Sequence, residues 1–134
     1  MQLLANIDVP DLARGEAFYT NAFGLNASRR FGGVVELAGG SSLIHLLEKA
    51  EGSFGAGDAT RTYGRHWTPV HLDFVVEDLD TTLAAAIKAG ATLENAPLTR
   101  VWGRIAMLSD PFGNGFCIIQ MLNRGYDELV EAAP

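Results

Sequence analysis

The chain has 134 residues, of which 48% are hydrophobic and 19% charged, and its formal net charge at pH 7 is −6. This length is typical of one compact domain, and the composition excludes a disordered chain. The negative charge argues against a nucleic-acid partner, because a phosphate backbone requires a basic surface. No apolar run approaches the roughly 20 residues that span a bilayer, so we expect no membrane-spanning segment.

The start of the chain and its cysteine content bear on the compartment. Asp8 lies in the first ten residues, no basic residue precedes it, and Cys117 is the only cysteine. These features do not predict a secretory signal. One cysteine cannot form an internal disulfide, which favours a reducing cytoplasm.

The first half of the chain predicts a strand, a helix and three further strands. Apolar residues alternate from Leu3 to Val9, which is the period of a strand with one face on a core. Asp11 is placed to cap a helix that ends at Gly24. Glycine pairs then separate three expected strands, at residues 25–31, 34–38 and 42–48.

The second half repeats this order. The pattern V-x-D-L at Val9–Leu12 recurs 67 residues later at Val76–Leu79, again after an alternating stretch. Asp78 and Gly90 bound a second helix, with Leu83 and Ile87 on its apolar face. Three strands are expected at residues 92–100, 104–109 and 115–122. The matching order and lengths indicate an internal duplication.

The predicted fold class is therefore α+β, with two βαβββ modules in one domain that covers residues 1–134. The modules span about 1–49 and 69–122, a glycine-rich linker covers 50–68, and a short tail covers 123–134. The linker is long for a compact domain, and such loops are usually mobile or functional.

The alternation also predicts which side chains face away from the helices. Asn6 and Asp8 do so on the first strand, and His71 and Asp73 on the equivalent strand of the second half. His45 and Cys117 correspond on the last strand of each half. Polar residues inside strands cost stability unless they are paired or used. We therefore predict a lined cleft that contains Asn6, Asp8, His45, His71 and Asp73.

Further residues complete this prediction. Trp67, Trp102 and Phe112 are candidate apolar walls, and Arg104 is a candidate contact for an anionic ligand. His71 is the candidate general base, because imidazole titrates near neutral pH, and Asp73 could orient a neighbouring group. Structural alternatives stay open: a strand histidine often packs in a core or rim, and Cys117 can be a small buried hydrophobe.

Three motifs run in a recognisable order along the chain: Val9-x-Asp11-Leu12 leading to Phe18-Tyr19 and Phe23-Gly24; Val70-His71-Leu72-Asp73-Phe74 leading to Asp78-Leu79; and Asp110-Pro111-Phe112-Gly113-Asn114 before the last strand. With them the chain resembles the vicinal oxygen chelate superfamily, which includes glyoxalase I, extradiol dioxygenases, and fosfomycin- and bleomycin-resistance proteins. The resemblance extends from Met1 to about Gln120. It implies two modules whose sheets curve around a shared cleft, and a homodimer.

In metal-using members of this superfamily, four strand positions converge on one ion. Carried over singly, they fall on Leu4, His45, His71 and Cys117. Leu4 cannot coordinate a metal, and the carboxylate expected at the last position is replaced by Cys117. The resemblance therefore implies a degenerate form of the usual metal site.

Two interpretations follow for the function. In the first, which the sequence favours, the cleft holds no cofactor and binds or transforms a small organic molecule; sequestration without turnover, as in drug-resistance proteins, is one form of it. In the second, His45, His71 and Cys117 hold Zn with an open fourth position and support lyase, isomerase or dioxygenase chemistry. The sequence does not decide between an enzyme and a binding protein.

Overall fold

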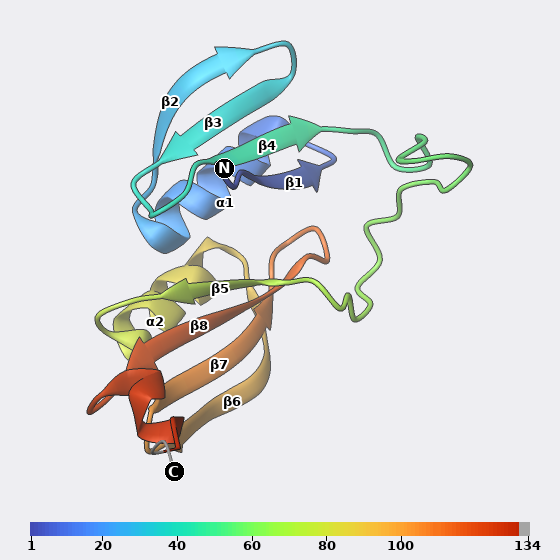
Figure 1. Ribbon diagram of the computed structural model, residues 1–134. Coiled ribbons are helices and arrows are strands. Elements are labelled where there is room, and N and C mark those ends of the chain that lie inside the picture. Colours follow the sequence, from blue (N-terminus) through green and yellow to red (C-terminus); the bar gives the residue numbers. More distant parts are fainter. Residues whose placement is uncertain (132–134) are drawn as a thin grey trace.

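The computed structural model describes residues 1–131 and shows two modules of the same topology (Figure 1). Each module has a four-stranded mixed sheet and one helix. The strand orders are β1-β4-β3-β2 in the first module and β5-β8-β7-β6 in the second. The predicted α+β fold with two βαβββ modules is confirmed. Residues 132–134, at the end of the predicted tail, lie outside the described part of the chain.

The first module follows the capping signals of its sequence. The Asp11 carboxylate accepts a hydrogen bond from the Arg14 N–H, and Gly24 ends the helix in the left-handed region at φ 66°. The first strand pairs in parallel with the last, and the other pairs are antiparallel. The elements are β1 (Ala5–Val9), α1 (Leu12–Phe23), β2 (Asn26–Phe31), β3 (Val34–Ala38) and β4 (Ile44–Glu48).

The second module repeats this arrangement. Asp78 caps its helix by accepting from the Asp80 and Thr81 N–H groups. The elements are β5 (Leu72–Val75), α2 (Leu79–Ala89), β6 (Thr92–Arg100), β7 (Gly103–Ser109) and β8 (Gly115–Met121), followed by the short 3-10 helix η1 (Gly125–Leu129). Within residues 1–131, no helix combines the length and the apolar character that crossing a membrane requires.

The two helices join the modules in one apolar core. α1 packs against α2, and the aromatic rings of Phe23 and Phe74 stack with centroids 3.9 Å apart. Phe18 on α1 and Phe116 on β8 belong to the same cluster. Ile87 was expected in this core but is 47% exposed, because α2 turns its smaller Ala86 inward.

The turn 110–114 is a second contact between the modules. The buried Asp110 carboxylate accepts hydrogen bonds from the N–H groups of Phe112 and Asn114. It also accepts from the Tyr19 hydroxyl of α1, with 2.6 Å between the oxygens. The Asn114 side-chain amide donates to the Asp8 carbonyl of β1 at 3.3 Å. This tight turn therefore also fixes the second module against the first.

The linker between the modules is held to the first one by Arg61. Arg61 Nε lies 2.6 Å from Asp8 Oδ2, and the same guanidinium donates to Ser53 Oγ and to the Phe54 carbonyl. The Tyr63 hydroxyl donates to the Lys49 carbonyl at 2.6 Å. Figure 1 shows this segment in green, running outside both sheets between β4 and β5.

Candidate functional site

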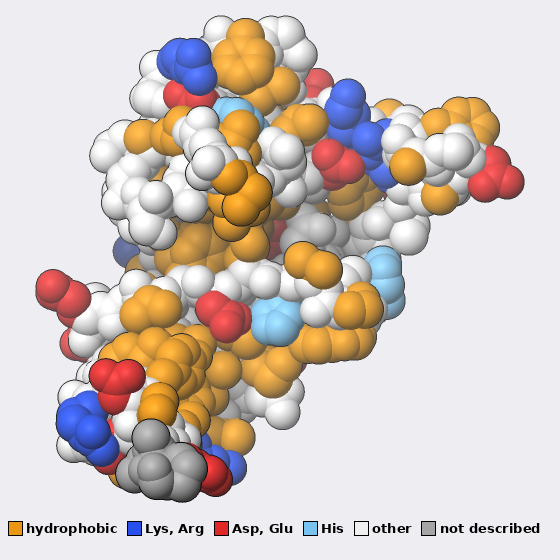
Figure 2. Space-filling model, viewed as in Figure 1, with side chains coloured by type: hydrophobic (Ala, Val, Ile, Leu, Met, Phe, Trp, Pro, Cys, Tyr) orange, Lys and Arg blue, Asp and Glu red, His pale blue; other side chains and the backbone are white. Residues whose placement is uncertain are grey.

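A cavity of about 780 Å³ lies between the two modules. Residues of β1 form one wall and residues of β5 the other. Thr62, Gly64, His66 and Thr68 of the linker cover it, and the residues 112–116 close it on a further side. Figure 2 shows the surface hollowed between the modules. The cavity is therefore formed by segments that are far apart in the sequence.

The walls present open strand edges to the cavity. In a parallel ladder, the N–H and C=O of one residue point to the same side, and successive residues alternate. The Ala5 N–H donates to the Leu43 carbonyl, directly before β4, and the Val76 N–H donates to the Ile119 carbonyl of β8. It follows that the backbone groups of Asn6 and Asp73 point away from these partners, toward the gap between β1 and β5. These edges offer donors and acceptors to a bound molecule.

The floor of the cavity is aromatic and its rim is polar. Tyr19, Phe112 and Phe116 are at most 4% exposed and line the cavity together with Phe74. Asn6, Asp8, His66 and His71 also line it. A mainly apolar surface with a few polar groups is the usual composition of a small-molecule site.

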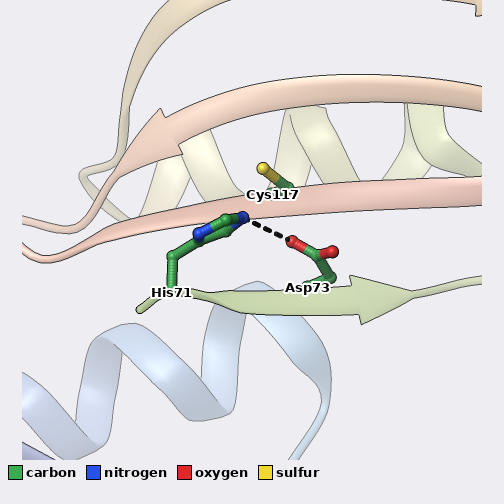
Figure 3. Close-up of side chains that lie close together, drawn as sticks. All are labelled: His71, Asp73 and Cys117. Carbon is green, nitrogen blue, oxygen red and sulfur yellow. Dashed lines mark ion pairs between the residues drawn. The ribbon is translucent and has the colours of Figure 1, made fainter. Parts of the chain in front are cut away.

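His71, Asp73 and Cys117 lie together at the edge of the second sheet (Figure 3). His71 Nε2 is 3.3 Å from Asp73 Oδ1, and one ligating atom of each residue lies within 4.8 Å of the others. Asp73 and Cys117 are paired residues of β5 and β8. The His71 ring also lies 5.3 Å from the Trp67 ring. Residues predicted as catalytic and as metal ligands thus meet at one place.

The surroundings of Cys117 keep its thiol protonated. Burial first, and then the charge and hydrogen bond of Asp73, together raise the pKa of Cys117 to about 11. A thiol must lose its proton to act as a nucleophile or a metal ligand. Imidazole nitrogen, carboxylate oxygen and thiolate sulfur together fit Zn, which takes four such ligands. Within this chain the group supplies three of them.

His45 does not belong to this group. It lies on β4 in the first sheet, where its Nε2 is 3.0 Å from Glu36 Oε2 and its Nδ1 is 3.2 Å from Asn6 Oδ1. Both ring nitrogens are therefore occupied by protein oxygens. The sequence predicted His45 as the third ligand beside His71 and Cys117. Among residues 1–131, the residue that lies beside these two is instead Asp73.

Glu36 is the polar residue that the sequence analysis missed. It is 3% exposed, and its carboxylate accepts hydrogen bonds from Arg29, Ser28 and His45. Arg29 first, and then His45 and Ser28, hold the pKa of Glu36 far below its usual range. The available signal was the acidic residue itself, in the middle of the apolar strand Val34–Ala38.

Of the remaining predicted ligand contacts, some line a cavity and others do not. Asn6, Asp8, His71 and Phe112 line the large cavity, and Trp67 lines a smaller recess that His71 and Cys117 share. Trp102 instead packs against Tyr126 with ring centroids 4.9 Å apart, and Arg104 forms an ion pair with Asp80 of α2. Both lie away from the cavity. Tyr19, Phe74 and Phe116 also line it, although the sequence did not predict any of them as a site residue.

Comparison with known proteins places this geometry in a family. Residues 5–119 match the family described as "Glyoxalase-like domain". "Putative glyoxylase CFP32" of Mycobacterium tuberculosis is 35% identical over 117 residues, which cover 84% of this chain and 40% of that protein. "Anthracycline biosynthesis protein DnrV" of Streptomyces peucetius is 39% identical over 61 residues, 46% of this chain and 21% of its own length. The chain thus spans less than half of either relative.

Solved structures agree over nearly the whole chain. A glyoxalase/bleomycin resistance protein/dioxygenase family enzyme from Burkholderia phytofirmans has a TM-score of 0.68 at 27% identity, covering 89% of this chain and 97% of that one. The antibiotic binding protein TnmS3 from Streptomyces sp. CB03234 has a TM-score of 0.64 at 23% identity, covering 91% and 96%. This second likeness shows the fold alone. From the motifs, the two-module fold and the match over residues 5–119, the chain belongs to the glyoxalase-like family.

Proposed function

We propose that this protein binds a small, mainly aromatic organic molecule in the cavity between its modules. The observation that carries the proposal is the cavity itself, whose volume of about 780 Å³ falls in the range of small-molecule sites. Its aromatic floor matches an apolar ligand, and its polar rim matches a ligand with a few hydrogen-bonding groups. The name of one protein of the same fold, an antibiotic binding protein, supports a small-molecule ligand.

The residues divide the work of binding. The exposed side chains of Leu3, Leu4 and Val70 offer apolar contacts to a ligand, and the buried rings of Tyr19, Phe112 and Phe116 border the cavity. Asn6 offers its side-chain amide and the backbone groups of an open strand edge. The linker residues, held to β1 by the Arg61–Asp8 ion pair, exclude water from one side.

A thermal-shift titration with a neutral anthraquinone tests the proposal. At about 100 times its dissociation constant, a ligand stabilises the folded state by about 2.7 kcal/mol, so the melting temperature rises. Leu4→Trp should weaken the rise, because Leu4 lines the cavity at 40% exposure and the larger side chain takes up part of the space for the ligand. Trp102→Ala is the matched control, since it removes an aromatic ring away from the cavity.

The two variants make the outcome decisive. A shift that survives in Leu4→Trp but disappears in Trp102→Ala would place the ligand near η1 and refute the proposal. Absence of stabilisation by any aromatic probe in the parent chain would refute it as well.

Proton transfer at His71 is a second candidate function. His71 lines the cavity, and its Nε2 faces Asp73 Oδ1 at 3.3 Å. When Nε2 carries the proton that faces Asp73, Nδ1 has the lone pair that a general base needs. This pair supports lyase or isomerase chemistry on a bound carbonyl compound. Deuterium exchange at the α-carbon of a bound ketone tests it: exchange that is equally fast in His71→Gln would contradict the role.

Zn at His71, Asp73 and Cys117 is a separate proposal, because Asp73 replaces the predicted His45 as third ligand. Bound Zn would act as a Lewis acid with an open position. Metal analysis of protein purified without chelator should then give about one Zn per chain, lost in Cys117→Ala and retained in His45→Ala. Metal-free parent protein that takes up no added Zn would contradict this.

The family resemblance also leads us to propose a homodimer in the cytoplasm. Val75, Leu98 and Val101 of the second module are exposed. Figure 2 shows a patch of apolar side chains over the lower half of the molecule. A second copy would cover such a surface. Light scattering after size-exclusion chromatography should give about twice the mass of 14.4 kDa; a monomeric mass at high protein concentration would contradict it.

A further inference from the structure

The charges around the cavity are strongly unequal. Of the described residues that line it, Asp8 is an acid and none is a lysine or an arginine. The only other ionisable groups in the lining apart from Tyr19 are the two imidazoles of His66 and His71. A ligand inside therefore meets no side chain that carries a permanent positive charge.

Two arginines of the linker beside the cavity are neutralised by carboxylates, whereas Arg14 of α1 lies over the Phe112 ring, 5.2 Å from its centroid. Arg61 Nε lies 2.6 Å from Asp8 Oδ2, and the rest of its guanidinium is bound to the linker. Arg65 forms a two-bond ion pair with Glu94, at 2.6 and 2.7 Å. A third hydrogen bond of Arg65, from Nη1, goes to the His66 carbonyl. Neither linker arginine has its charge free for a ligand.

Two further carboxylates lie close to the walls. Asp110, directly behind the floor, is 3% exposed and accepts hydrogen bonds only from neutral donors in the described chain: Tyr19, Phe112 and Asn114. Asp73 stands beside His71, which lines the cavity. Charges in a partly buried recess are screened less than charges on an open surface. Among the described residues near the walls, two carboxylates without a lysine or arginine partner, Asp110 and Asp73, therefore compare with one arginine outside an ion pair, Arg14 over the Phe112 ring.

Resting on the proposed function, we infer that the cavity selects neutral and cationic aromatic molecules, such as aromatic amines, and rejects anionic ones. An anion that enters must leave its hydration shell without gaining a cationic partner, which is costly. An ammonium group gains the attraction of Asp110, whose carboxylate forms no ion pair among the described residues, and can bond to Asn6 or to the open strand edges. This differs from the anionic ligand that the sequence suggested for Arg104, whose charge is paired with Asp80.

Three probes of one size separate the cases: 9-anthracenemethanol, 9-(aminomethyl)anthracene and 9-anthracenecarboxylate. They share the ring system and differ in charge, so fluorescence titration at about pH 8 compares neutral, cationic and anionic forms. The amine should bind at least about tenfold more tightly than the carboxylate. Added salt should lower the affinity for the amine and leave the affinity for the alcohol unchanged.

Two variants reverse and enhance this preference. Asp8→Asn removes the acid and frees Arg61, so affinity for the carboxylate should rise and that for the amine should fall. Arg61→Gln leaves Asp8 unpaired, so the amine should bind more tightly. Asp127→Asn on η1 is the control, because it makes the same change in net charge as Asp8→Asn away from the cavity. Thermal melts verify that each variant folds.

The outcomes distinguish this inference from the proposed function. Binding of all three probes with equal or higher affinity for the carboxylate overturns the charge selection and leaves small-molecule binding standing. An amine preference that Asp8→Asn and Arg61→Gln do not move in opposite directions also overturns it. Absence of binding by any probe, or binding that Leu4→Trp leaves intact, refutes the cavity as a binding site.

Discussion

The two modules have one topology but opposite chemistry on their open sheet faces. In the first module, Asn6, His45, Glu36 and Arg29 form a row of paired positions across β1, β4, β3 and β2. In the second, the corresponding row begins with Asp73, Cys117 and Met107 on β5, β8 and β7. The first row is a continuous chain of hydrogen bonds and ion pairs. The second contains a protonated thiol between a carboxylate and a thioether.

This difference indicates that the two modules have different roles. A paired polar row fixes strand register and occupies both ring nitrogens of His45 and the carboxylate of Glu36. The second module keeps His71 at the cavity with a single carboxylate partner. We infer that the first module mainly supplies a rigid wall, and that reactive groups belong to the second.

The largest loss of unfolding free energy is expected at the turn 110–114, through which the second module contacts the first. Asp110→Ala removes a buried acceptor from Tyr19, Phe112 and Asn114, and should cost about 3 kcal/mol of unfolding free energy in urea denaturation. Ser42→Ala, in the corresponding turn of the first module, should cost less than about 0.5 kcal/mol. Equal losses would show that the turns do not differ in role.

The paired row of the first module should control acid stability. The pKa of Glu36 is lowered in the folded state, so its carboxylate stabilises the fold above the ordinary glutamate pKa of about 4.3, and this contribution is lost as the pH falls. Below about pH 4, the parent protein should therefore lose stability more steeply than Glu36→Gln. Glu51→Gln in the exposed linker should follow the parent curve. Parallel curves for all three proteins would contradict this account.

In the second module, thiol reactivity reports the neighbouring carboxylate. Asp73 contributes to the raised pKa of Cys117, so Asp73→Asn should lower that pKa and speed alkylation by iodoacetamide a few-fold at about pH 8. Burial, the larger cause, remains, so the reaction stays slower than that of a free thiol. Asp80→Asn on α2 should leave the rate unchanged. An alkylation rate that Asp73→Asn leaves unchanged would show that Asp73 does not influence the Cys117 thiol.

The smallest effects are expected at the ion pairs that join strand and helix in each module. Arg30 pairs with Glu16 in the first module and Arg104 with Asp80 in the second. Because each pair includes a strongly exposed partner, Arg30→Gln and Arg104→Gln should each cost about 0.5 kcal/mol or less. Neither variant should change the affinity for an aromatic probe. Loss of binding in Arg104→Gln would restore the ligand contact predicted from the sequence.

The fold followed from local signals in the chain. Helix caps at Asp11 and Asp78 and the repeated alternation were enough to locate the helices and strands within one or two residues. Ile87 was misplaced because periodicity alone does not show which face of a short, alanine-rich helix meets its neighbour.

The site could be predicted only in part, since it depends on how the modules meet. The alternation of side chains along the strands correctly predicted that His71 and Asp73 lie together. The same alternation predicted His45 beside them, although His45 lies in the other sheet. The roles of Tyr19 and Phe116 depend on the gap between β1 and β5, which no local pattern describes. Glu36 was missed because a single acid in an apolar strand has many local explanations.

A crystal structure of the protein with bound 9-(aminomethyl)anthracene tests the central claim most directly. The account predicts the ring system between β1 and β5, in contact with Phe112 and Phe116, and the ammonium group on the side of Asp8. Density for the probe on the open face of the second sheet, over Cys117 and Met107, would contradict it.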